Sequence, residues 1–106
     1  MFLSRLSFHT LPGKTDEVEG KLMKLLQWVE EAGGSKPRIM RTHFGSIGAP
    51  DLLFEQGAED LGALETQIQK VTANGDFHSW SQQVSGLLQQ ASKRELFRIT
   101  DRAIEP

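Results

Sequence analysis

The chain has 106 residues, a formal net charge of −2 at pH 7 and no cysteine. This length predicts a single domain over residues 1–106, near the size at which dimerisation contributes needed stability, and the mixture of apolar and charged residues is typical of a soluble globular protein. The small negative charge argues against nucleic acid as a partner, and the lack of cysteine excludes disulfides, zinc–thiolate sites and cysteine nucleophiles.

Residues 2–9 alternate between two faces, as a half-buried strand does. One face carries apolar side chains and the other carries a mixed set: Phe2, Leu6 and Phe8 against Leu3, Arg5, Ser7 and His9. Because Arg5 and His9 interrupt the apolar residues, this segment is neither a signal peptide nor a membrane span. We therefore expect a cytoplasmic protein without membrane contact.

A helix is predicted after the break at residues 11–14, Leu-Pro-Gly-Lys. Thr15 is a plausible capping hydroxyl, and Asp16 and Glu17 suit the positive end of the helix dipole. The apolar residues recur at helical spacing: Val18, Leu22, Leu25, Leu26 and Val29. The pair Gly33-Gly34 ends the helix.

Two further strands are predicted at residues 38–44 and 51–56, joined by a Gly/Pro-containing loop. In the first, Met40, Thr42 and Phe44 are assigned to the apolar face, opposite Ile39, Arg41 and His43. In the second, Leu52 and Phe54 are assigned to the apolar face, opposite Leu53 and Glu55.

The remaining residues predict two helices, a last strand and a tail. Asp60 can cap a helix whose apolar residues are Leu61, Leu64, Ile68 and Val71, and after a break at residues 74–76 a second helix carries Phe77, Trp80, Val84, Leu87 and Leu88. A strand at residues 95–100 sets Phe97 and Ile99 on the apolar face, against Leu96, Arg98 and Thr100. Residues 101–106 are expected to form a tail.

The order β-α-β-β-α-(α)-β predicts an α+β fold of the ferredoxin-like, split βαβ type. Its four-stranded antiparallel sheet has helices on one face, which must pack on the apolar sides of the strands. The opposite face is then predicted to carry Arg5, Ser7, His9, Arg41, His43, Glu55, Arg98 and Thr100.

Two segments resemble a known superfamily. A strand ending in Leu11-Pro12-Gly13-Lys14, before a helix with an acidic start, is similar to the opening of many dimeric α/β-barrel proteins. The strand ending in Leu53-Phe54-Glu55, with the later Phe77-His78-Ser79-Trp80, resembles their second half. The resemblance covers nearly the whole chain and is strongest to the NIPSNAP and antibiotic-biosynthesis-monooxygenase branches.

This resemblance implies a homodimer in which two open sheet faces close a barrel around an interior cavity. The superfamily includes cofactor-free monooxygenases, haem-degrading enzymes, isomerases and proteins with no known activity, and their sites generally lie between the sheet and the helices or inside the barrel. Because no catalytic signature of one branch is complete in this sequence, the resemblance indicates a fold and assigns no catalytic residue.

The predicted polar face has two interpretations. Guanidinium groups bind carboxylates and phosphates, and a histidine can exchange a proton, so this face can hold a small anionic or aromatic metabolite. Alternatively, its arginines pair with Glu55 in a subunit interface, since buried charges must be paired. The candidate ligand-binding residues are Arg5, His9, Arg41, His43, Glu55, Arg98 and Trp80.

Other chemistries have less support in the sequence. Only His9 and His43 of the three histidines share the predicted face, and without HxH or HExxH spacing no metal site or cofactor is expected. Phe77 and Trp80 lie three residues apart on a helix, which indicates core packing or a cavity wall. The sequence leaves two functions open, a homodimeric metabolite-binding module and a cofactor-free monooxygenase- or isomerase-like enzyme.

Overall fold

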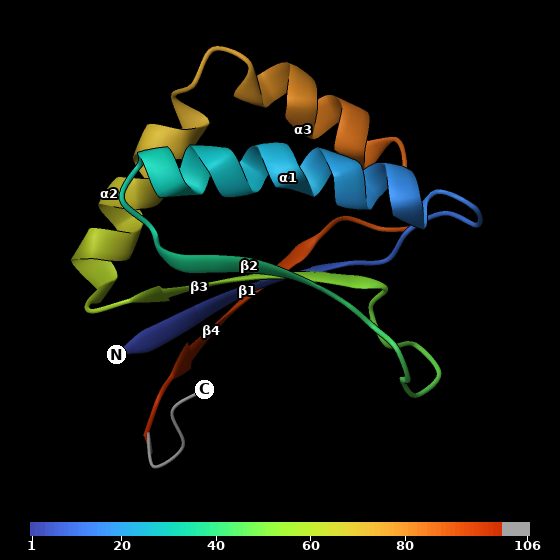
Figure 1. Cartoon of the computed structure of the whole chain (residues 1–106), viewed down its shortest axis with the longest axis horizontal. Coiled ribbons are helices and arrows are strands. Elements are labelled where there is room, and N and C mark those ends of the chain that lie inside the picture. Colours follow the sequence, from blue (N-terminus) through green and yellow to red (C-terminus); the bar gives the residue numbers. More distant parts are fainter. Residues whose placement is uncertain (101–106) are drawn as a thin grey trace.

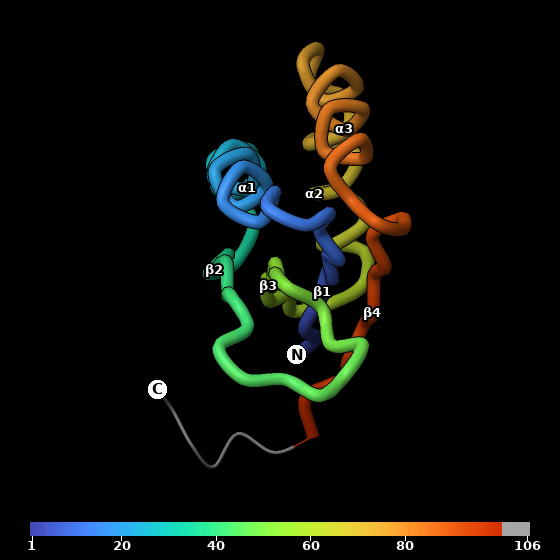
Figure 2. Tube along the Cα trace, turned by 90° about the vertical axis from the view of Figure 1, so that its right-hand side faces the viewer, coloured from blue at the N-terminus to red at the C-terminus, as the bar shows by residue number. Residues whose placement is uncertain are grey.

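A computed structural model describes residues 1–100, which form the predicted ferredoxin-like fold. The elements follow the order β1 (Phe2–Phe8), α1 (Thr15–Glu31), β2 (Ser35–Arg41), β3 (Leu52–Ala58), α2 (Leu61–Thr72), α3 (Phe77–Ser85) and β4 (Lys93–Arg98). The four strands make one antiparallel sheet in the order β2-β3-β1-β4, and the helices cover one of its faces (Figures 1 and 2). The sheet is open rather than closed into a barrel, and the tail predicted at residues 101–106 lies outside the described residues.

Helix α1 forms where the sequence predicts it, although its N-terminus differs in one detail. Thr15 is the first helical residue instead of the cap, and its hydroxyl pairs with the Thr10 hydroxyl at 2.7 Å. The helix ends where Gly33 takes a positive φ of 88°, which is favourable for glycine alone among common residues. Helix α2 begins as predicted, because the Asp60 carboxylate accepts a hydrogen bond from Ala63 N at 2.7 Å.

The core lies between the helices and one face of the sheet. Strands β1 and β3 present the predicted apolar side chains to it, including Phe8, Leu52 and Phe54, and α1 contributes Leu22 and other residues that recur at helical spacing. The alternation in these two strands therefore determined their orientation correctly.

The predicted orientation of β2 is wrong. The strand lies at Ser35–Arg41, three residues earlier than predicted, and its register with β3 shifts between Ser35 and Arg38. Residues directly opposite each other in an antiparallel pair share a face, so Ile39, opposite Phe54, faces the helices, and Met40, opposite Leu53, faces away. His43 and Phe44 lie beyond the strand in the loop to β3.

The predicted orientation of β4 is also wrong. Phe97 lies opposite Leu3 and Arg98 lies opposite Phe2. Phe97 is therefore on the open face and Arg98 is on the helix face, because Leu3 and Phe2 point to those two sides of β1. All of β4 is exposed, as its place at the sheet edge requires.

Candidate functional site

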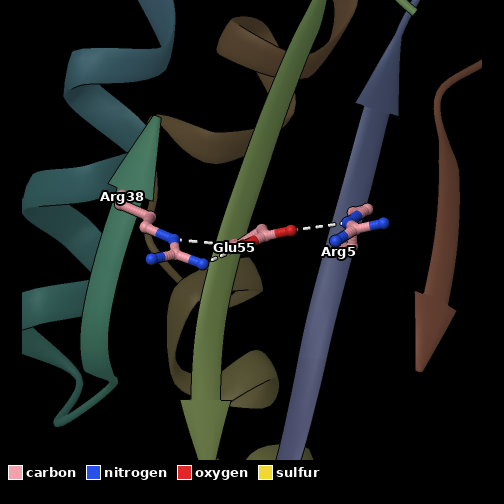
Figure 3. Close-up of polar contacts among 3 residues, drawn as sticks. All are labelled: Arg5, Arg38 and Glu55. Atoms are coloured by element: carbon pink, nitrogen blue, oxygen red, sulfur yellow. Dashed lines mark hydrogen bonds and ion pairs between the residues drawn. The ribbon is translucent and has the colours of Figure 1, made fainter. Parts of the chain in front are cut away.

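The open face of the sheet has a buried carboxylate at its centre. Glu55 on β3 is only 1% exposed, and its two oxygens are bound from neighbouring strands (Figure 3). Arg5 Nε on β1 donates to Oε2 at 2.5 Å, while Arg38 on β2 donates to Oε1 from its terminal nitrogen at 2.7 Å and from Nε at 3.1 Å. We call Arg5, Glu55 and Arg38 the ion-pair cluster.

This cluster holds Glu55 in its charged form. Burial by itself would raise the pKa of the carboxyl, but the hydrogen bonds and charges of Arg38 and Arg5 together outweigh burial, so the pKa lies below its ordinary value. Arg5 also places its guanidinium over the Phe97 ring, 5.0 Å from the centroid. Both carboxylate oxygens are therefore occupied by protein groups, which supports the predicted pairing of arginines with Glu55 and leaves neither oxygen free for a ligand.

Several predicted members of the polar face lie elsewhere. Arg41 is on the helix-facing side of β2 and its terminal nitrogen binds Asp16 of α1 at 2.6 Å. Arg98 is on the helix-facing side of β4, and His43 is exposed in the loop after β2. These three residues therefore do not join the ion-pair cluster, and Arg38, which the sequence analysis did not place there, takes the predicted role of Arg41.

His9 lies just beyond β1 and is held at both ring nitrogens. Its Nε2 lies 3.0 Å from the Gly48 carbonyl oxygen, which can only accept, so Nε2 carries the proton. Its Nδ1 lies 3.2 Å from the side-chain nitrogen of Gln90, which donates. Because both nitrogens are used, His9 fixes the loop containing Gly48 against the segment before β4 and is not poised over a ligand site.

Apolar side chains surround the ion-pair cluster on the same face. Each of the four strands contributes one, namely Leu3, Met40, Leu53 and Phe97, and none of them is fully buried. The loop between β2 and β3 projects away from the helices in both views and carries the exposed side chains of Phe44 and Ile47 (Figures 1 and 2). The open face is thus amphiphilic, with a paired charge at its centre and apolar groups around it.

A cavity of about 190 Å³ lies on the opposite side of the sheet, under the helices. Its walls are mainly apolar and come from α1, α2, α3, β1 and β3; they include Leu6, Phe54, Val71, Phe77, Trp80 and Val84. Of the candidate residues from the sequence, all within the described part of the chain, Trp80 alone lines it. The Trp80 indole nitrogen donates to the Lys21 carbonyl at 2.9 Å and its ring packs edge-on against Trp28, so Trp80 is a fixed wall of the cavity.

The cavity has polar groups that the sequence analysis missed. Arg94 on β4 lines it and donates to the buried Ser4 hydroxyl at 2.5 Å. The residue as a whole is exposed, and the part of its side chain that is covered loses enough solvation to lower the pKa of the guanidinium. Among the described residues, Arg94 is the one ionisable group of the lining, and it forms no ion pair. Gln56 and Gln67 also line the cavity, and both are almost completely buried.

A signal for these residues was present in the sequence. Gln67 falls between Leu64 and Val71 at the spacing of a buried helix face, and Gln56 follows the alternation of Leu52 and Phe54. A polar residue at a core position is unusual and marks either an internal hydrogen bond or a site. In contrast, no group of three or more histidine, aspartate or glutamate side chains within residues 1–100 is close enough to hold a metal ion.

The fold is shared with solved structures of two kinds. The sequence matches no family model and no curated protein. A NIPSNAP domain protein from Burkholderia xenovorans superposes with a TM-score of 0.79 at 11% identity, over 99% of this chain and 100% of that chain. A NIPSNAP family protein from Agrobacterium tumefaciens gives 0.79 at 14% identity, over 95% of this chain and 94% of that chain.

A protein named as a putative antibiotic biosynthesis monooxygenase, from Deinococcus radiodurans, gives a TM-score of 0.72 at 14% identity, over 100% of this chain and 98% of that chain. Identities this low show the fold alone. The resemblance inferred from the sequence is therefore confirmed for the fold. In the described part of the chain, no helix is long and apolar enough to cross a membrane.

Proposed function

We propose that this protein is a homodimeric small-molecule-binding protein whose ligand has an aromatic body and an anionic group. The ligand occupies the cavity between the sheet and the helices, with its anionic group at Arg94. The observation that carries this proposal is the combination of an apolar cavity with a single cation in its wall that has no carboxylate partner among the described residues.

The size of the cavity defines the body of the ligand. An apolar cavity of about 150 Å³ in another protein binds benzene. A volume of about 190 Å³ therefore admits one aromatic ring with a short substituent. The side chains of Phe54, Phe77 and Trp80 in its walls offer the ring favourable stacking and edge contacts.

The charge of Arg94 defines the other end of the ligand. A guanidinium favours a nearby anion, and its planar fork matches a carboxylate in particular. Arg94 uses one terminal nitrogen for Ser4, which leaves further N–H groups for a ligand. An aromatic carboxylate meets both requirements of the cavity.

The open face supports the homodimer. A second copy would cover the apolar groups around the ion-pair cluster and the exposed Phe44 and Ile47 of the loop. Apolar side chains around a paired charge are typical of an interface, in which arginine is enriched and buried charges are neutralised. The ligand site and the dimer face then lie on opposite sides of one sheet.

Binding is favoured over catalysis by the lining of the cavity. Abstraction of a proton from a substrate needs a base, and within residues 1–100 the lining contains serine, threonine and glutamine side chains but no carboxylate or imidazole. Cofactor-free oxidation of a bound aromatic molecule is the second candidate, and it is supported by the shared fold with proteins named as monooxygenases.

Calorimetric titration with 3-phenylpropanoate tests the proposal. We expect the wild-type protein to bind this probe, and Arg94→Gln to weaken binding by about tenfold to a hundredfold, because a charge-assisted hydrogen bond contributes about 1.5–3 kcal/mol. Arg98→Gln is the matched control, since Arg98 is on the same strand and the same face but does not line the cavity. Equal loss in the two variants, or no binding to the wild type, would overturn the proposal.

A further inference from the structure

Two glutamine side chains at the cavity carry buried polar atoms without a hydrogen-bond partner. Gln56 and Gln67 are 4% and 6% exposed. Gln56 Oε1 and both amide atoms of Gln67 make no hydrogen bond in the folded chain. Nearly all buried polar groups in proteins are paired, because an unpaired one costs free energy, so three unpaired atoms at one place need an explanation.

Gln56 and Arg94 are both related to the same residue of the central strand, Ser4. Gln56 is directly opposite Ser4 in the β1–β3 pair, and residues opposite each other share a face. Ser4 is the residue to which Arg94 donates. Gln56 on β3 and Arg94 on β4 therefore lie on the two sides of β1, with Ser4 between them, and Arg94 stands in the row of Leu6 and Phe54.

The fold also keeps space for the Gln56 amide. A Cβ atom on Gly34 would lie 2.8 Å from Gln56 Oε1 and 2.3 Å from a methyl group of Val29, so a larger residue at this position would displace both. Gln56 and Gln67 also line a second pocket, next to Gly33 and Gly34, so the two residues border both this pocket and the cavity that contains Arg94. Both residues thus line space that a bound molecule can occupy.

We propose that Gln56 and Gln67, together with Arg94, select a carboxylate that carries an adjacent hydroxyl group. This inference rests on the proposed function and names the ligand class more narrowly. A carboxylate accepts hydrogen bonds from Arg94 but cannot donate to Gln56 Oε1. A hydroxyl on the neighbouring carbon donates to Gln56 Oε1 and accepts from Gln67 Nε2, so a 2-hydroxy acid with an aromatic ring pairs with the cation and with two of the three unpaired amide atoms.

A purely structural role for the glutamines makes a different prediction. Amides that stabilise a core do so through hydrogen bonds to other protein groups, and their replacement by an apolar residue destabilises the fold. Amides that await a ligand are unpaired until it binds, and their replacement by an apolar residue of similar size stabilises the unliganded protein. The stability of Gln67→Leu without ligand distinguishes the two roles.

The experiment compares 3-phenylpropanoate with 2-hydroxy-3-phenylpropanoate, each enantiomer of the latter separately, by calorimetric titration. We expect the wild-type protein to bind one enantiomer of the hydroxy acid about tenfold more tightly than 3-phenylpropanoate. Gln67→Leu should lose this preference and retain its affinity for 3-phenylpropanoate, and its unliganded melting temperature should rise. Gln69→Leu, an exposed position on the same helix, is the matched control and should change neither property.

Each other outcome overturns the inference. Equal binding of the two acids by the wild-type protein would do so, as would a Gln67→Leu variant that keeps the preference or melts below Gln69→Leu. If Gln67→Leu does not fold, the amide has a structural role and the inference is wrong. In all these cases the proposed function still holds if Arg94→Gln weakens the binding of 3-phenylpropanoate. If neither acid binds to the wild-type protein, both proposals are wrong.

Discussion

Arg38 and Glu55 lie opposite each other on β2 and β3, and the Arg38 guanidinium donates two hydrogen bonds to one carboxylate oxygen, Oε1. Arg5 binds the other oxygen from β1. Three strands of the sheet are therefore joined by one buried carboxylate, whose charge is balanced by the two guanidinium groups.

Arg38→Ala should lower the free energy of unfolding by about 1–3 kcal/mol, because it leaves one oxygen of a buried carboxylate unpaired. Since Arg38 is itself more than half exposed, water can reach the vacated place and moderate the loss. Glu55→Gln in the same chain should recover part of it by removing the charge. A double-mutant cycle in denaturant measures this coupling.

Arg41→Ala is the control for this cycle. Arg41 pairs with exposed Asp16 and does not reach Glu55, so its loss should cost less than about 1 kcal/mol and should not couple to Glu55→Gln. Strong coupling between Arg41 and Glu55 would contradict the arrangement described above.

The pH dependence of stability should reflect the lowered pKa of Glu55. A carboxyl whose pKa is lower in the folded than in the unfolded chain stabilises the fold above its ordinary value of 4.5, and this contribution is lost as the pH falls through the lower, folded value. As the pH falls below 4.5, the free energy of unfolding of Glu55→Gln should therefore decrease less steeply than that of the wild type. Urea unfolding at a series of acidic pH values tests this, and identical slopes would contradict it.

The open face should mediate dimerisation. We expect a dimer at micromolar concentration, because a second copy on this face would bury the roughly 1,000 Å² that a specific contact needs. Leu53→Lys places a charge among the apolar groups of that face and should give a monomer in sedimentation velocity. Met23→Lys adds the same charge on the exposed side of α1 and should remain a dimer; a monomeric wild-type protein would refute this prediction.

The core between α1 and the sheet should be sensitive to truncation. Leu22→Ala and Phe54→Ala each remove a large side chain that is almost completely buried, and should each cost about 2–5 kcal/mol. Met23→Ala, next to Leu22 but 55% exposed, should have little effect. Chemical denaturation measures all three, and a neutral Leu22→Ala would contradict the packing of α1.

The cap of α2 offers a paired test of local structure. Asp60→Ala removes the acceptor for Ala63 N and should cost about 0.5–2 kcal/mol. Asp76 occupies the same position before α3 but makes no side-chain cap bond, so Asp76→Ala should cost less. Equal losses in thermal unfolding would show that the Asp60 hydrogen bond contributes nothing specific.

The order of the elements was predictable because each segment carries its own pattern. In β1 and β3 the larger number of apolar residues falls on one face, with only Leu3 and Leu53 on the other, and the apolar residues of α1 recur at helical spacing. The cap at Asp60 and the end of α1 at Gly33 are likewise local features. The sequence by itself therefore determined the fold class, the orientation of the central strands and the place of Glu55 on the open face.

Only the tertiary structure decided the orientation of the two edge strands and the composition of both sites. In β2 and β4 each face carries an apolar residue, such as Ile39 and Met40 or Leu96 and Phe97, so alternation does not choose between them. The choice comes from pairing with the neighbouring strand, and a shift of one residue reverses every side chain. In the same way, Arg94, Ser4 and Gln56 are distant in sequence and meet because β1 lies between β3 and β4 in the sheet.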